Sequence, residues 1–409
     1  MNKVSEYNRY LRYKNNELFL EDISLLNVAS KFYTPLYCYS ISQMEDNYRN
    51  LKNSFKKIKP LICYALKANF NREIIRTFSS LGLGVDVVSS GELKKSLSNG
   101  FDRSKIVFSG VGKTTQEIEI AIKKRIKQIN VESIEELEEI NYLCKKLSRK
   151  INICLRVNPN IDAGTHEKIS TGRSEDKFGI PDENIQSIFE KYKENKLINI
   201  IGLSIHIGSQ IETLEPFKKA FKRIKGIVLN LRNLGFKVCC LDLGGGVGIR
   251  YNQKSKIINI KSYVKLIEEI FSNLGLEIIL EPGRYLVGSS GIIVSRVIRV
   301  KEGIDKDFTI IDAGMDNLIR PALYGAIHKI IPVKRLNNKK NKPCDIVGPI
   351  CETSDIFINK FKDHSFQRHD LVAILSTGAY SSCMASRYNL REKANEIFIK
   401  KKKINISNK

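Results

Sequence analysis

The sequence lacks any run of about 18 or more uncharged apolar residues, and its first seven residues lack the apolar segment of a signal peptide. We therefore expect no membrane partner and a cytoplasmic protein. None of the nine cysteines forms a CxxC pair or a Cys/His cluster with zinc spacing. Neither a disulfide framework nor a metal site is expected, and the thiols are predicted to be reduced.

Acidic residues are few relative to basic ones, 44 Asp and Glu against 68 Lys and Arg, which gives a net charge of +24. Such a charge would suit a polyanion partner such as nucleic acid. The basic residues are instead spread along the chain, often on predicted helices that also carry acids, as in 117–125. No nucleic-acid motif accompanies them. A general bias toward lysine, isoleucine and asparagine explains the charge, and no nucleic-acid partner is expected.

Short β-rich runs alternate with amphipathic helical stretches between residues 35 and 285, which is the pattern of a parallel α/β fold. We predict eight strands, at 60–66, 84–88, 106–108, 128–131, 151–157, 201–207, 238–243 and 277–280. Eight strands favour a closed (β/α)8 TIM-like barrel. A doubly wound open sheet remains possible, because the strand count is weak evidence for closure.

The pattern changes from about residue 286 to β-like runs with few long helices between them. These runs lie at 291–300, 308–312, 330–333, 345–347 and 371–375. They predict a second, mostly antiparallel β domain, to which the segment around 16–19 could add a strand. We therefore expect a barrel domain over 30–285 and a β-rich domain made of 1–29 plus 286–409.

Lys67 follows the apolar run 61–66, which is predicted to be a buried strand. A buried ammonium is costly, so burial would lower the pKa of this amine and prime it to form a Schiff base with a carbonyl. Pyridoxal phosphate is the obvious carbonyl compound. Alternatively, Lys67 caps the strand and reaches solvent.

Barrel enzymes place their active sites at the carboxyl ends of the strands, and two further strand ends carry suggestive residues. The strand at 201–207 contains His206 near its end, although a lone histidine is more often structural than catalytic. The strand at 238–243 runs into the glycines of 244–246, whose backbone N–H groups could turn toward a phosphate. A tight turn explains the glycines equally well, and the dinucleotide pattern GxGxxG is absent.

Glu281 and Arg284 follow the last predicted strand, within one short turn. This pair suits a site that binds both a cation and an anion. Glu281 could keep the pyridine nitrogen of pyridoxal phosphate protonated, while Arg284 could meet a phosphate or a carboxylate. An ordinary ion pair at a strand end is the alternative.

A series of motifs in register extends the argument over about residues 30 to 395. They are YALKAN (64–69), VDVVSSGEL (85–93), FSGVGKT (108–114), NVES (130–133), STGRSEDKFGI (170–180), HIGSQ (206–210), DLGGGVGI (242–249), EPGR (281–284), DAGMDNLIRPALYGA (312–326), GPICETSD (348–355) and GAY (378–380). In these motifs the chain resembles the fold-type III pyridoxal-phosphate decarboxylases and, within them, the diaminopimelate decarboxylases. The resemblance implies an alanine-racemase-like pairing of barrel and β domain.

The resemblance also implies which residues hold the cofactor, pyridoxal 5'-phosphate. Lys67 would carry it as a Schiff base, with Asp86 nearby. His206 would stack on the ring, and Glu281 would pair with the ring nitrogen. The residues implied to surround the phosphate or complete the cofactor site are Ser209, Gly244, Gly245, Gly246, Gly283, Arg284 and Tyr380.

The implied reaction is decarboxylation of meso-2,6-diaminopimelate to L-lysine and CO2, the last step of bacterial lysine biosynthesis. Cys351 is the implied acid that protonates the α-carbon, with an inert thiol as the alternative. The substrate carries a distal amino-carboxylate that ornithine and lysine lack. The residues implied to bind it are Arg284, Arg320, Tyr324, Glu352 and Tyr380.

In the family that the motifs indicate, Cys351 and Glu352 of one subunit complete the site around Lys67 of the other, which implies a homodimer with shared active sites. The segment 162–179 is expected to be a mobile lid. Two alternatives stay open. One is a related enzyme acting on another diamino acid, of the ornithine, lysine or carboxynorspermidine type, or a racemase. The other is a catalytically silent homologue, although the candidate catalytic positions are intact.

Overall fold

The computed structural model describes residues 4–164, 171–173, 175–336 and 342–407. Residues 165–170 and 174 of the expected lid therefore lie outside the described residues. The chain divides into two compact units. The barrel unit comprises Tyr48–Gly248 and Ile257–Gly283, and the β unit comprises Met1–Asn47, Ile249–Lys256 and Arg284–Lys409. No helix within the described ranges is long and apolar enough to cross a membrane.

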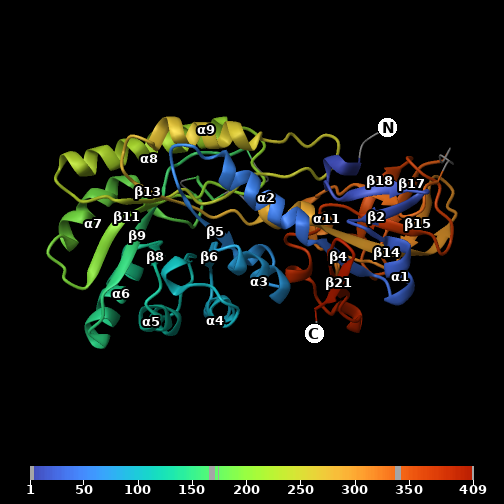
Figure 1. The fold of residues 1–409 in the computed structure, drawn as a ribbon, viewed down its shortest axis with the longest axis horizontal. Coiled ribbons are helices and arrows are strands. Elements are labelled where there is room, and N and C mark those ends of the chain that lie inside the picture. The colour runs from blue at the N-terminus through green and yellow to red at the C-terminus, as the bar shows by residue number, and fades with distance from the viewer. Residues whose placement is uncertain (1–3, 165–170, 174, 337–341, 408–409) are drawn as a thin grey trace. The chain divides into compact units, whose positions relative to one another are not determined.

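Eight parallel strands close the barrel, which confirms the predicted fold class and excludes the open sheet (Figure 1). In order they are β5 (Leu61–Ala65), β6 (Gly84–Val87), β7 (Ile106–Phe108), β8 (Gln128–Val131), β9 (Ile151–Asn158), β11 (Ile198–Ser204), β12 (Cys240–Asp242) and β13 (Glu277–Leu280). Closure is made by β13, which pairs in parallel with β5. The two-residue strand β10 (Ile180–Pro181) pairs with the end of β9.

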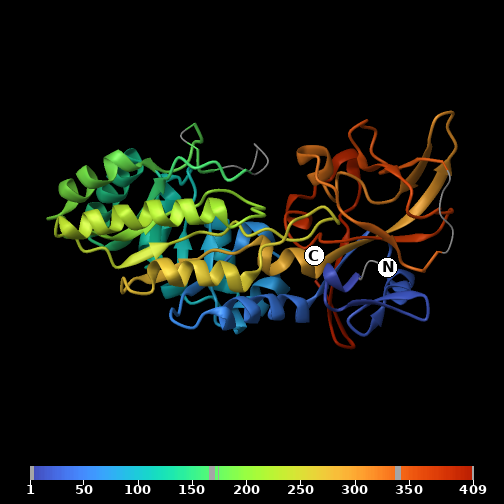
Figure 2. The same ribbon diagram turned by 90° about the horizontal axis from the view of Figure 1, so that it is seen from above.

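Helices follow the strands around the outside of the barrel, and α8 and α9 run beside each other in both views (Figures 1 and 2). They are α3 (Arg72–Ser80), α4 (Ser90–Ser98), α5 (Thr115–Lys124), α6 (Ile134–Leu147), α7 (Ile185–Tyr192), α8 (Glu215–Asn233) and α9 (Ile260–Phe271). The boundary between the two units falls within α2 (Ile41–Ser54). Side-chain caps start several helices; Thr114, for example, forms a reciprocal capping box with Glu117.

The barrel interior changes from apolar to polar along the strands. Cys63, Val107, Cys154, Cys240 and Ile279 form a buried apolar cluster. Burial raises the pKa values of the Cys63 and Cys154 thiols well above their usual range, so these cysteines pack as core residues. Polar side chains come later on the same strands and, because all strands are parallel, gather at one end of the barrel.

The β unit contains a mostly antiparallel sheet, as predicted, built around the long strand β14 (Gly291–Lys301). Its other strands are β4 (Leu36–Ser40), β15 (Asp307–Ile311), β16 (Ile330–Pro332), β17 (Cys344–Val347), β18 (Ile356–Phe361), β19 (Leu371–Ile374), β20 (Asn395–Lys400) and β21 (Lys403–Ile406). Two short helices, α10 (Arg284–Val287) and α11 (Arg320–Tyr324), carry candidate site residues.

A small three-stranded antiparallel sheet also belongs to the β unit. It consists of β1 (Leu11–Lys14), β2 (Glu17–Leu20) and β3 (Ile23–Ser24), followed by α1 (Leu25–Lys31). The segment around 16–19 thus forms a strand, but that strand belongs to the small sheet instead of the large one. Its buried leucines join the apolar core of the β unit.

Candidate active site

Lys67 lies in a short 3-10 turn directly after β5, and its Nζ is 3.0 Å from Oδ2 of Asp86 on β6. The Asp86 side chain is fully buried, whereas the Lys67 side chain is 37% exposed. Lys67 is therefore only partly buried, between the fully buried Leu66 and Ala68, and its predicted Schiff base stays a prediction. Oδ1 of Asp86 is buried and has no hydrogen-bond partner. The carboxylate can thus hold the amine while keeping one oxygen for another group.

A cavity of about 360 Å³ opens at this end of the barrel unit. It is lined by Lys67 together with Asn130, Arg156, His206 and Glu281, which lie within or just beyond four other strands. A cavity of this size at the carboxyl ends of barrel strands suits a small ligand. Tertiary structure therefore brings Lys67, His206 and Glu281 to one pocket, as the sequence predicted.

Glu281 and Asp242 are buried carboxyl groups that interact with each other. Burial, followed by the charges of Asp242 and Asp86, raises the pKa of Glu281 well above its usual range. Burial also raises the pKa of Asp242, and the hydrogen bond that Nδ2 of Asn130 donates to it at 2.9 Å opposes this rise. Burial beside Asp242 therefore favours the protonated form of Glu281. A protonated carboxyl group here is suited to bond with a basic ring nitrogen.

His206 lies two residues beyond β11 and is partly buried. Removal from water, together with the charges of Arg156 and Lys67, lowers its pKa well below the usual range. The backbone N–H of Gly245 donates to Nδ1 of His206 at 3.2 Å, so the proton of the neutral ring is on Nε2. An uncharged imidazole can lie against an aromatic ring without an ionic partner.

Arg156 is a site residue that the sequence analysis missed. Arg156 lies on β9 and lines the pocket. Its Nη1 donates to Oε1 of Glu132 at 2.6 Å, and its guanidinium lies 4.8 Å from the ring centre of Phe178. A charged residue within an otherwise apolar predicted strand was the available signal. Asp242, at the end of β12, could have been found in the same way.

The glycines after β12 allow the loop to approach neighbouring strands closely. A Cβ on Gly245 would be 2.4 Å from the carbonyl oxygen of Glu281, and a Cβ on Gly244 would be 2.5 Å from that of Ile205. The N–H groups of Gly244 and Gly245 donate to Asp242 and His206 respectively. These two glycines therefore fix pocket side chains, and their predicted contact with a phosphate stays a prediction. The same holds for Gly246, Gly283 and the half-buried Ser209.

The β unit brings together a second set of predicted residues, Arg284 and Arg320. Both are buried, with 7% and 4% of their surface exposed. Nη1 of Arg284 donates to the hydroxyl of Tyr251, and its guanidinium lies 4.8 Å from the ring centre of Tyr380. The guanidinium of Arg320 lies 4.2 Å from the ring centre of Tyr251. Tyr251 was not predicted, yet it contacts both arginines.

Arg320 forms no ion pair with any acidic residue in the described part of the chain, and its Nε is buried without a hydrogen-bond partner. A buried guanidinium in this state has capacity for an anion. Tyr380 has a left-handed backbone (φ 55), and such strain is concentrated at functional sites. Tyr324, the last residue of α11, is half-buried.

Cys351 and Glu352 lie on the loop between β17 and β18 and are exposed in the single chain. The hydroxyl of Tyr388 donates to Oε1 of Glu352 at 2.7 Å. The exposure of Cys351 distinguishes it from the buried cysteines of the barrel interior. Its predicted role as a proton donor stays a prediction.

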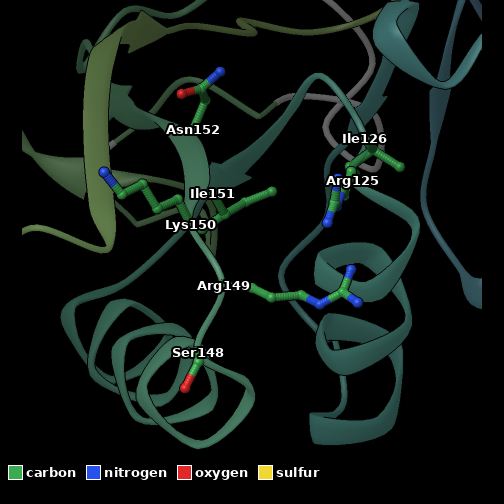
Figure 3. Close-up of a pocket in the computed structure, with 7 residues that line it drawn as sticks. All are labelled: Arg125, Ile126, Ser148, Arg149, Lys150, Ile151 and Asn152. Atoms are coloured by element: carbon green, nitrogen blue, oxygen red, sulfur yellow. The ribbon is translucent and has the colours of Figure 1, made fainter.

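A second concavity lies at the opposite, amino-terminal end of β8 and β9 (Figure 3). Three basic residues line it, Arg125, Arg149 and Lys150, together with Ile126, Ser148, Ile151 and Asn152. Arg149 already donates to the carbonyl of Lys123 at 3.2 Å. Exposed basic side chains alone define no binding site, so the chemistry is expected at the Lys67 end.

Known proteins similar to this chain are pyridoxal-dependent decarboxylases. Residues 41–288 match the family model described as "Pyridoxal-dependent decarboxylase, pyridoxal binding domain". The diaminopimelate decarboxylase of Aquifex aeolicus is 40% identical over 98% of this chain and 94% of the relative, and that of Neisseria meningitidis is 42% identical over 93% of each. The solved diaminopimelate decarboxylase of Helicobacter pylori, complexed with L-lysine, has a TM-score of 0.90 and 39% identity, covering 94% and 96% of the two chains.

The relatives match both the barrel unit and the β unit, with little of either chain left uncovered. The pocket supplies the amine of Lys67, the buried carboxylate of Asp86 and the carboxyl group of Glu281 with its raised pKa, which fit pyridoxal phosphate. The chain therefore belongs to the pyridoxal-dependent decarboxylases and, within that family, to the diaminopimelate decarboxylases.

Proposed function

We propose that this protein decarboxylates meso-2,6-diaminopimelate to L-lysine and carbon dioxide, with pyridoxal phosphate bound through Lys67. The observation that carries the proposal is the pairing of Lys67 with buried Asp86 at the mouth of a cavity that also holds Glu281. An amine, an anion that orients it and an acid for the ring nitrogen are the groups that this cofactor requires.

Pyridoxal phosphate, when bound, supplies an electron sink for the bond to the departing carboxylate. Asp86 holds the amine of Lys67 in place, and the raised pKa of Glu281 suits this carboxyl group to share a proton with a ring nitrogen. His206 stays neutral because Gly245 occupies Nδ1, so the ring presents a flat uncharged face. Cys351 would return a proton to the carbon that has lost carbon dioxide.

Selection of the substrate depends on the β unit. We assign Arg284 and Arg320, with Tyr324 and Tyr380, to the distal carboxylate and Glu352 to the distal ammonium. The unpaired, buried Nε of Arg320 supports this assignment, because an anionic ligand would satisfy it. L-Ornithine has no second carboxylate and would leave the group unsatisfied. A site built around such a polar contact discriminates by about a thousandfold or more.

A homodimer and a cytoplasmic location complete the proposal. In the dimer, Cys351 and Glu352 of one copy would complete the site around Lys67 of the other. Exposure of both residues in the single chain supports a partner there. Mixing a Lys67→Ala variant with a Cys351→Ala variant tests this, because only mixed dimers regain one intact site. No recovery of activity after subunit exchange would contradict the shared site.

The function itself is tested with a substrate panel. Carbon dioxide release is measured from meso-diaminopimelate, L-ornithine and L-lysine at equal concentrations. We expect release from diaminopimelate to dominate, and equal rates would refute the assignment of Arg320 and Tyr324. In parallel, Lys67→Ala should abolish the visible absorbance of the bound cofactor and its trapping by borohydride. An unchanged chromophore would remove Lys67 from the site.

A further inference from the structure

His328 is a fully buried histidine of the β unit, 1% exposed, to which the proposed reaction gives no part. Its Nδ1 is 2.8 Å from the carbonyl oxygen of Leu375, which can only accept a hydrogen bond. Its Nε2 is 2.8 Å from Nη1 of Arg320, which can only donate. Nδ1 therefore carries the proton and Nε2 offers a lone pair. The two neighbours leave the ring one tautomer and no net charge.

The backbone around His328 is fixed as firmly as the ring. The N–H of Lys329 donates to the carbonyl of Tyr251 at 2.8 Å, and the N–H of Leu375 donates to the carbonyl of Lys329 at 2.9 Å. Three segments that are far apart in sequence thus meet at this histidine.

Arg320 is held between two of these residues. Nη1 is bonded to His328, while the face of the guanidinium lies on the ring of Tyr251 at 4.2 Å. The rings of Tyr251 and His328 meet edge to face, with centres 4.8 Å apart. The guanidinium is therefore fixed both in its plane and perpendicular to it, although Arg284 nearby repels it.

We propose that His328 is a positioning residue for the substrate: it holds the guanidinium of Arg320 so that Nε is left for the distal carboxylate. This inference rests on the proposed function, which assigns that carboxylate to Arg320. Burial, together with the charge of Arg320, lowers the pKa of His328 to about 3, so the ring stays an acceptor at neutral pH. A protonated ring would repel Arg320 and lose the bond.

Two substitutions separate positioning from mere packing. In glutamine, Oε1 is as many bonds from Cβ as Nε2 is in histidine, so His328→Gln keeps an acceptor for Arg320. In asparagine, Nδ2 corresponds to Nδ1 of histidine, so His328→Asn keeps only the bond to Leu375. Both variants replace the ring by an acyclic amide. The two variants therefore keep opposite halves of the hydrogen bonding of His328: His328→Gln keeps the contact to Arg320, and His328→Asn keeps the contact to Leu375.

The measured quantity is the affinity of the holoenzyme for a ligand. The change in absorbance of the bound cofactor reports the binding. L-Lysine retains a carboxylate that cadaverine lacks, so the ratio of their affinities measures recognition of that group. Loss of a hydrogen bond to a charged group predicts that His328→Asn weakens L-lysine binding by about tenfold to hundredfold. Cadaverine binding should stay within about twofold, and His328→Gln should keep most of the preference for L-lysine.

An Arg320→Ala background completes the experiment. There, His328→Asn should cause no further loss of L-lysine binding, because the group it positions is gone. The inference is overturned if His328→Asn keeps the native preference, or if both substitutions weaken L-lysine and cadaverine alike. If His328 has no effect while Arg320→Ala still abolishes the preference, only the inference fails. If Arg320→Ala itself leaves the preference intact, the proposed substrate assignment fails with it.

Discussion

Substitution of Gly245 by alanine should damage both the stability of the barrel unit and cofactor binding. The new Cβ would be 2.4 Å from the carbonyl oxygen of Glu281 and 3.1 Å from its carbonyl carbon. Real Cβ atoms almost never approach closer than 3.0 Å, so the two segments must separate by about 0.6 Å, the difference of the two distances. Neither atom belongs to a flexible side chain that could move away.

The separation would strain bonds that build the pocket. Glu281 donates its N–H to the carbonyl of Gly244 at 2.7 Å, and Gly245 donates its own to His206 at 3.2 Å. Overpacking of this kind costs about 2–3 kcal/mol. For a unit of this size each kcal/mol corresponds to about 2–4 °C, so we expect the unfolding temperature to fall by about 5–10 °C.

Thermal unfolding followed by circular dichroism, and titration with pyridoxal phosphate followed by absorbance, measure the two effects. Gly226→Ala is the matched control, because Gly226 lies within α8 and a Cβ added there would meet no atom within 4 Å. Alanine should stabilise that helix by about 0.5–1 kcal/mol. The reasoning is refuted if Gly245→Ala unfolds and binds the cofactor like the native protein.

Three further predictions concern protonation, chemistry and stability. His328 has a pKa of about 3 when folded against 6.5 ordinarily, so its contribution to stability is complete above pH 6.5 and is lost as the pH falls. That loss is at most about 1.4 kcal/mol per pH unit. Between pH 7 and pH 5, the free energy of unfolding in urea should therefore fall less for His328→Gln than for the native protein. Equal falls in the two proteins would contradict this prediction. Glu281→Gln should lower kcat by about a hundredfold or more while the cofactor still binds, because an amide cannot share a proton as the carboxyl group does. A variant with native turnover would show that Glu281 does not share a proton with the cofactor. Thr114→Ala removes the capping box of α5 and should cost about 1 kcal/mol in denaturant unfolding, with no change in cofactor affinity.

Several barrel strands could be predicted to the residue. The strands β7, β8 and β13 occupy the predicted ranges, because each is a short buried run bounded by polar residues or turns. For β11 the prediction 201–207 was shifted, since the strand is Ile198–Ser204. The apolar side chains of Ile205 and Ile207 are buried in the loop beyond the strand. Apolar sequence marks burial, and burial is not confined to strands.

Strand β4 shows what local sequence cannot decide. All five of its residues are buried, as in a barrel strand, yet it pairs with β14 and β20 of the β unit. Its partners are more than 250 positions away in the chain. No local periodicity carries information about pairing over such a separation.

The residues of the chemistry were largely determined by the sequence, since Lys67, His206, Glu281 and Arg320 stand in motifs whose order and spacing identify the family. Their physical states were decided only by the tertiary structure. Burial and the charge of Asp242 raise the pKa of Glu281, and a backbone N–H that meets Nδ1 of His206 leaves the proton of that ring on Nε2. Desolvation and neighbouring charges set these states, and both depend on which distant segments the fold brings into contact.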